Sequence, residues 1–165
     1  DGKNRVRITN AKNREINVEP AVSPDGKKIA FSSDRHGNQH IYTMDIDGKN
    51  VKRVTFAGTF NAAPTWSPDG KKIVFAGLDK SNYDLFVINV DGTGLEKLTS
   101  ATKKNGKPAN NEYATFSPDG RQIIFVSDRT GAKQLYIINI DGTNERRLTF
   151  DAHDYFSPKW LWKLD

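Results

Sequence analysis

The sequence predicts an all-β protein built from a repeated unit of four short strands. One stretch that contains Ser-Pro-Asp-Gly occurs three times, at residues 21–31, 64–75 and 115–125. A second motif occurs four times, in which Asp-Gly is followed by a short segment that ends in an aliphatic residue and Thr. The serines of the first motif are spaced by 44 and then 50 positions, at Ser23, Ser67 and Ser117. Periods of this size are typical of solenoids, propellers and repeat arrays.

The expected strands of one unit follow in a fixed order. A first strand runs up to Ser-Pro-Asp-Gly, where proline suits the second position of a type I turn and glycine the fourth, so that the chain reverses tightly. Second strands are expected at residues 28–32, 72–76 and 122–126. Third strands are expected at residues 41–44, 85–88 and 135–138. Fourth strands follow the Asp-Gly turns, which are a strong hairpin signal, within residues 1–9, 47–55, 91–99 and 141–149.

The second and third strands of each unit are apolar on both faces. Runs such as Ile-Val-Phe and Leu-Phe-Val-Ile do not alternate with polar residues, as they would in a sheet with one face in water. Both faces must therefore be covered, which requires the sheets to stack on one another. Small four-stranded antiparallel sheets stacked around an axis form a β-propeller. The sequence thus predicts three complete propeller blades plus one N-terminal outer strand and one C-terminal inner strand.

The amino-acid composition limits the kinds of partner that this chain is expected to bind. The 165 residues carry 25 Lys and Arg against 20 Asp and Glu, a formal net charge of +5 that is spread along the chain without a basic cluster. We therefore expect no nucleic-acid partner. There is no cysteine, which excludes disulfides and cysteine metal sites. No apolar run approaches the roughly 20 residues that span a bilayer, so no membrane span is expected.

Several spaced elements recur together and carry a family resemblance. Residues 61–75 have the pattern Asn-x-x-Pro-x-Trp-Ser-Pro-Asp-Gly-Lys-Lys-Ile-Val-Phe, and Ser-Asp-Arg occurs at residues 33–35 and 127–129. These elements resemble the WD-like repeat of the TolB-like β-propellers. The second unit departs from the pattern with Gly-Leu-Asp-Lys at residues 77–80, so its outer loop is expected to differ. The resemblance implies a central channel lined by first strands, with one mouth formed by the loops that lead into them.

The resemblance covers nearly the whole chain, which we interpret as a single propeller segment. We expect an outer strand of a split blade at 1–9, blades at 10–56, 57–100 and 101–150, and the first strand of a further blade at 151–165. Propellers typically have about four to eight blades, and an open arc of three exposes more apolar surface than a monomer usually tolerates. Three alternatives stay open. The chain is a segment of a longer propeller, two copies close a ring about a two-fold axis, or the two ends assemble a degenerate fourth blade.

Candidate binding residues lie at the expected mouth of the channel. Residues that occur in every unit, such as the turn aspartates, are interpreted as structural. Departures from the repeat beside the first strands are better candidates, together with the asparagines that lead into those strands and a basic insertion at residues 103–108. The expected binding residues are Glu19, Asn61, Asn111, Glu112, Tyr113, His153, Asp154 and Tyr155.

No catalytic residue is expected. The chain has no Gly-x-Ser-x-Gly elbow and no cysteine that could serve as nucleophile. His36, His40 and His153 fall in different loops without zinc-ligand spacing, so no metal site or other cofactor is assigned. A calcium ion at the channel mouth, held by Asp, Glu and backbone oxygens, is the one alternative left open.

The resemblance implies a non-enzymatic scaffold that binds a protein partner in the bacterial periplasm or cell envelope. Self-association that closes the ring is a second expected interaction. The alternative function is that of a non-catalytic, substrate-gating propeller domain of a larger peptidase or polysaccharide-degrading enzyme. A carbohydrate-binding module has little support, because the repeat positions of Trp66 and Trp160 predict burial.

Overall fold

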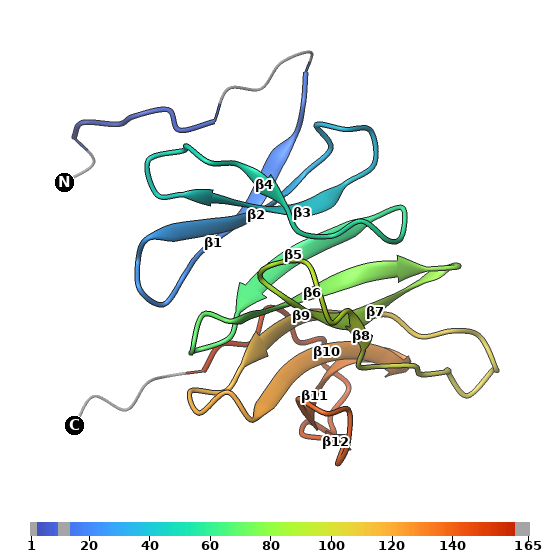
Figure 1. The fold of residues 1–165 in the computed structure, drawn as a ribbon. Helices are drawn as coiled ribbons and strands as arrows, with labels where there is room; N and C mark the ends of the chain where they lie inside the picture. The colour runs from blue at the N-terminus through green and yellow to red at the C-terminus, as the bar shows by residue number, and fades with distance from the viewer. Residues whose placement is uncertain (1–2, 10–13, 161–165) are drawn as a thin grey trace.

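Three antiparallel sheets of four strands each make up the fold, and they stack one on another (Figure 1). The computed structural model describes residues 3–9 and 14–160, and within them it contains strands and no helix. Blade 1 consists of β1 (Asn17–Val22), β2 (Lys28–Ser33), β3 (His40–Asp45) and β4 (Lys52–Arg53). Blade 2 consists of β5 (Asn61–Trp66), β6 (Lys72–Asp79), β7 (Asn82–Asn89) and β8 (Glu96–Lys97). Blade 3 consists of β9 (Asn111–Phe116), β10 (Gln122–Thr130), β11 (Ala132–Asn139) and β12 (Arg146–Arg147).

The strands of every blade pair in sequence order, as an antiparallel meander. The first strands lie side by side, with β5 in contact with both β1 and β9. The sheets form an open arc of three blades, which confirms the predicted all-β fold class. No segment described in the structure is a helix that could cross a membrane.

The Ser-Pro-Asp-Gly turns explain why each first strand ends where it does. In blade 1 the Ser23 hydroxyl donates a hydrogen bond of 2.6 Å to Asp25 Oδ1, and the Gly26 amide donates to the Ser23 carbonyl over 2.9 Å. Gly26 has a φ of 71°, a conformation that glycine adopts without steric cost. The same bonds recur at the turns that begin with Ser67 and Ser117, so the predicted reversal forms identically three times.

The hydrophobic core lies between the blades. The cluster between blades 1 and 2 comprises Ala30, Ile41, Val54, Trp66, Ile73, Phe75 and Ile88. The cluster between blades 2 and 3 comprises Val74, Leu85, Val87, Leu98, Ala114, Phe116, Ile123, Phe125, Tyr136 and Ile138. Because successive strand residues point to opposite faces, Ile73 and Phe75 pack toward blade 1 while Val74 packs toward blade 3. Burial of one large apolar side chain contributes about 1.5–3 kcal/mol, so these two clusters hold the stack together.

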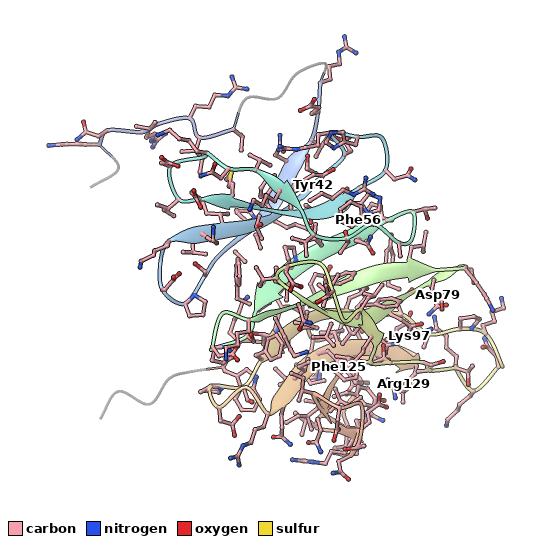
Figure 2. All side chains as sticks on the ribbon, viewed as in Figure 1. Tyr42, Phe56, Asp79, Lys97, Phe125 and Arg129 are labelled. Atoms are coloured by element: carbon pink, nitrogen blue, oxygen red, sulfur yellow. The ribbon has the colours of Figure 1, made fainter. Side chains whose placement is uncertain are left out.

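The outer loop of blade 2 differs from that of its neighbours, as the departure at residues 77–80 indicated. Leu78 and Asp79 pair with Tyr83 and Asn82, so β6 and β7 continue to a tight turn. Gly77 fits here because a Cβ at this position would lie 2.9 Å from the Phe86 ring. Asp79 then forms a salt bridge of 2.6 Å with Lys97, and both are seen at the outer edge of the blade (Figure 2).

Residues 3–9 lie against blade 1 without forming the expected strand. A Cβ on Gly48, in the β3–β4 turn, would overlap the carbonyl oxygen of Ile8. The same contact recurs one blade later, where a Cβ on Gly92 would lie 3.1 Å from the carbonyl oxygen of Val54. Ile8 therefore occupies the position that an outer strand takes on the following blade. The segment has no strand structure because the described residues offer it no third strand to pair with; residues 1–2 of the expected strand lie outside the described residues.

Residues 151–160 follow the path of a first strand against blade 3. The amide of Tyr155 donates to the Lys133 carbonyl over 2.8 Å, as the Asn61 amide donates to the Gln39 carbonyl over 2.9 Å. This segment also lacks strand structure, since no second strand lies beside it in the described chain. Residues 161–165 lie outside the described residues, and the blade boundaries proposed from the sequence stay a prediction.

Candidate functional site

Each first strand carries a bulge at the same position. The register shifts within β1, β5 and β9, and the bulge residues Glu19, Ala63 and Tyr113 have φ values of 54°, 52° and 56°. Ser157, at the corresponding position of the last segment, has a φ of 47°. A bulge re-aims the residue that it contains, and here it turns one residue of every first strand toward the axis of the arc.

A cavity of about 300 Å³ opens where these bulges meet. Its walls include the three bulge residues and Ser157, and Thr65 and Lys159 also line it. A second cavity, of about 250 Å³, shares Thr65 and Lys159 with the first and is bounded by the turn prolines Pro24, Pro68 and Pro118. Both cavities lie along the first strands, on the side of the arc where the resemblance predicts a central channel; the channel itself stays a prediction.

Glu19 joins the first strands of two blades. Its Oε2 accepts a hydrogen bond of 2.8 Å from the Ser32 hydroxyl, within blade 1, and one of 2.7 Å from the Ala63 amide of blade 2. The bulge leaves that amide pointing away from β6, so that an acceptor from the neighbouring blade can reach it. A carboxylate in this position is therefore bound by a backbone amide and a hydroxyl at the wall of the channel.

Glu112 and Tyr113 lie with Lys133 on the blade 3 side of the mouth. The Lys133 Nζ atom is 3.8 Å from Glu112 Oε2, 5.8 Å from the centre of the Tyr113 ring and 5.0 Å from that of the Phe156 ring. Burial raises the pKa of Glu112, and the charge of Lys133 opposes the shift. The Tyr113 side chain is 37% exposed and so presents an aromatic surface beside a cation.

Asn61 and Asn111 are buried between blades instead of facing the mouth. The Asn61 Nδ2 atom donates to the Ala57 carbonyl over 2.9 Å and lies 3.0 Å from His40 Nδ1. Asn111 Nδ2 donates to Asp84 Oδ1 over 2.8 Å, and its Oδ1 accepts a bond from Arg129. Their amide groups are satisfied within the protein, so both residues fix neighbouring blades to each other.

His153, Asp154 and Tyr155 attach the last described segment to β11. Asp154 Oδ1 accepts the amide of Lys133 over 2.6 Å, and the His153 carbonyl accepts Gln134 Nε2 over 2.7 Å. The Tyr155 hydroxyl donates to Asp151 Oδ2 over 2.6 Å. The His153 side chain is 86% exposed, with its Nδ1 atom 3.5 Å from Asp151 Oδ1, so a partner could reach this imidazole.

Sequence reasoning missed several of the residues that line the cavity. Ala63, Ser157 and Lys159 were not candidates, although the first two stand at the same repeat position as Glu19 and Tyr113. Proline follows this position at Pro20, Pro64 and Pro158, and that shared dipeptide was a usable signal.

The insertion at 103–108 lies elsewhere: Lys103 forms a salt bridge of 2.8 Å with Asp128 of blade 3. Within residues 3–9 and 14–160, no group of three or more acidic or histidine side chains could hold a metal ion.

Comparison with known protein families identifies the family of this chain. The model of the TolB beta propeller domain matches residues 1–108 and 59–163. The Tol-Pal system protein TolB of Bordetella pertussis is 45% identical over 47 residues, which are 28% of this chain and 10% of that protein. The solved structure of a putative TolB from Agrobacterium tumefaciens is 28% identical with a TM-score of 0.74, over 82% of this chain and 47% of that one. TolB from Acinetobacter baumannii is 30% identical with a TM-score of 0.72, over 87% of this chain and 35% of that one. The chain thus spans less than half the length of each of these proteins.

Proposed function

Because this chain belongs to the TolB β-propeller domain family, we propose that it is a non-enzymatic scaffold that binds a protein partner at the mouth of its channel. The observation that carries the proposal is the cavity at the axis, with the exposed Tyr113 at its rim. The name of the Bordetella relative places that protein in a Tol-Pal system. By analogy, the scaffold proposed here acts in the bacterial periplasm or cell envelope, with a component of such a system as its partner.

The surface beside the cavity has the chemistry of a protein contact. Tyr113 is 37% exposed and Phe156 is 57% exposed, with the Lys133 ammonium group between their rings. Aromatic residues dominate the binding energy of protein interfaces. Glu112 and the His153 imidazole add polar groups on the same side, from the set expected on sequence grounds. We leave the buried Asn61 and Asn111 out of the contact surface.

A second part of the proposal concerns the open end of the arc. In β1, Val18 is 38% and Val22 56% exposed, while β5 and β9, each packed against an earlier blade, bury most of their residues. Further blades, from a second copy or from a longer chain, would cover β1. Light scattering after size exclusion tests this: a mass of twice the chain supports a second copy, and a stable monomer without exposed-surface dye binding contradicts the need for any cover.

Binding to a Pal protein encoded in the same genome tests the main proposal, by isothermal titration calorimetry. Tyr113→Ala should weaken binding by about 2 kcal/mol, the loss typical of an aromatic hot spot. Phe56→Ala is the matched control, because Phe56, which is labelled in Figure 2, is 70% exposed and is not among the residues that line the cavity. Equal affinities for the wild type and Tyr113→Ala would overturn the assignment of the mouth, and loss of binding in Phe56→Ala alone would move the interface to the outer edge.

The alternative, a substrate-gating domain of a larger peptidase or polysaccharide-degrading enzyme, stays a prediction. Sequencing the parent gene for a downstream Gly-x-Ser-x-Gly segment decides between the two.

A further inference from the structure

The backbone amides of the bulge residues form a series along the channel. In β5 the pairs Asn61–Gly77 and Ala62–Ala76 leave the Ala63 amide directed away from β6, and Glu19 accepts its hydrogen. The register of β9 is the same, with Asn111 opposite Ser127 and Glu112 opposite Val126. The Tyr113 amide is therefore directed off the sheet edge toward the preceding blade, as the Ala63 amide is.

The Glu19 carboxylate, which accepts the hydrogen bond of the Ala63 amide, has no equivalent in the next blade. The bulge residue that would reach the Tyr113 amide is Ala63 itself, whose methyl group cannot accept a hydrogen bond. Ser32, which supports the Glu19 carboxylate, is replaced at the corresponding position by Ala76. No side-chain acceptor is seen for the Tyr113 amide within the described residues, and both Ala63 and Tyr113 line the 300 Å³ cavity.

The charged side chains that line this cavity are Glu19 and Lys159, and of the two Glu19 is already bound by hydrogen-bond donors of the protein. Lys159 lines the cavity, and within residues 3–9 and 14–160 no carboxylate pairs with that lysine. Lys133 adds a second cation 5.8 Å from the centre of the Tyr113 ring. Of the carboxylates nearby, Glu19 is bound to Ser32 and the Ala63 amide, and Glu112 lies 3.8 Å from Lys133. A backbone amide with a cation nearby is a strong donor set for a carboxylate oxygen.

We propose that the cavity binds a carboxylate group of a ligand, which accepts the hydrogen bond of the Tyr113 amide beside Lys159. The Glu19 carboxylate on the Ala63 amide is the template for this contact within the same molecule. The inference deepens the proposed function, because it names the chemical group that a partner polypeptide would insert into the mouth. The binding chemistry itself does not need that partner.

Amide-resolved NMR with sodium acetate as probe tests the site, with sodium chloride at equal ionic strength as reference. The Tyr113 amide should shift in a saturable way with acetate, and the Ala63 amide should not move, because Glu19 already occupies it. An acidic peptide with blocked ends, acetyl-Gly-Glu-Gly-amide, forms the second arm. Tighter binding of the peptide than of acetate identifies a protein side chain as the natural source, and equal binding identifies a free carboxylate. A Tyr113 shift identical in chloride and acetate overturns the proposal.

Two substitutions test the site in opposite ways: one fills the proposed carboxylate position, and the other frees a second amide. Ala63→Glu should supply the carboxylate from within and weaken the acetate response of Tyr113 at least tenfold. Ala63→Met, which is similar in size and has no oxygen acceptor, is its control. The backbone tolerates the change, since Glu19-Pro20 already has the conformation of Ala63-Pro64. Glu19→Ala should make the Ala63 amide respond to acetate, because it removes the acceptor of that amide. Glu19→Met, which also lacks an oxygen acceptor, is the second variant if the first fails to fold. An unchanged Tyr113 response in Ala63→Glu contradicts the site.

The outcomes separate the two proposals. If acetate binds at Tyr113 while the Pal protein does not bind at all, the carboxylate site holds and the proposed function fails. If the Pal protein binds with no acetate response at Tyr113, the function holds and the carboxylate site is wrong.

Discussion

The two junctions between blades have the same backbone geometry and different chemistry at their polar centres. Between blades 1 and 2 the centre is His40, 3% exposed, whose Nδ1 lies 3.0 Å from Asn61 Nδ2 and 3.3 Å from the Thr55 hydroxyl. Between blades 2 and 3 the same position is Asp84, 2% exposed, which accepts bonds from Asn111 and the Thr99 hydroxyl and forms a salt bridge of 2.8 Å with Lys97.

The difference shows which residues of a junction are the same in both repeats and which one can vary. In both junctions an asparagine that leads into a first strand, and a threonine that follows an outer strand, reach the central residue. That residue can be a neutral ring or a charged carboxylate, provided that its partners are present. A buried charge needs a complete set of hydrogen-bond and ion-pair partners. In the second junction Lys97 completes that set by forming the ion pair with Asp84.

The largest effect should follow removal of the charged centre. Asp84→Ala leaves the donors of Asn111 and Thr99 without an acceptor, and breaking a buried ion pair costs about 3–5 kcal/mol. Lys97 keeps Asp79 at 2.6 Å, so we expect a loss near the lower value, about 3 kcal/mol, in urea unfolding. Asp79→Asn, which removes the more exposed partner, should cost less than about 1 kcal/mol. Equal losses for the two variants would mean that the junction does not depend on Asp84.

The neutral junction should be less sensitive at the same position. His40→Ala removes one buried hydrogen-bond partner and some packing, which we expect to cost about 1–2 kcal/mol in urea unfolding. His40→Gln is the conservative control, because Gln134 occupies this position in blade 3, fully buried and bonded to Arg147 and His153. A loss in His40→Ala as large as in Asp84→Ala would contradict the distinction between neutral and charged junctions.

The two junctions also differ at the channel wall, where Glu19 connects blade 1 to blade 2. Glu19→Gln keeps one acceptor oxygen but loses the charge that strengthens its bonds to Ser32 and the Ala63 amide. The expected loss is about 1 kcal/mol or less, measured as a shift in the urea midpoint. A faster hydrogen-exchange rate at the Ala63 amide, with an unchanged rate at the Tyr113 amide, would locate the effect in the first junction. Equal changes at both amides would contradict this assignment.

The smallest effect concerns pH and should also be confined to the first junction. Burial lowers the pKa of His40 below its ordinary value of 6.5, with Arg53 adding to the shift. Below about pH 6.5 the unfolded chain takes up a proton at this imidazole that the folded protein does not. Stability should therefore fall as the pH drops from 6.5 toward the folded pKa. The difference in stability between the wild type and His40→Gln across pH 5–8 isolates this contribution, and a pH-independent difference would refute it.

The repeat made the fold predictable, whereas the site depended on contacts between repeats. Strand positions follow from local turns and apolar runs, and each Ser-Pro-Asp-Gly forms its turn from its own four residues. Asn61 was expected at the mouth because it precedes a first strand, but its side chain turns back to the blade before it. Its amide nitrogen reaches both the nearby Ala57 carbonyl and His40, 21 positions earlier, and the contact with His40 exists only once blades 1 and 2 have packed together. The bulge at Ala63 was missed although proline follows it, as proline also follows Glu19 and Ser157, because an alanine carries no polar group that suggests a binding role.

The contact between the carbonyl oxygen of one outer segment and the turn glycine of the next blade has a consequence for how such chains grow. It is made by Ile8 on Gly48 and Val54 on Gly92, and at longer range by Leu98 on Gly142. Every unit therefore carries both halves of the joint, a carbonyl for its successor and a glycine for its predecessor. A gene duplication that copies one unit adds a blade that already fits at both sides, so blade number can change in evolution without any new interface having to arise.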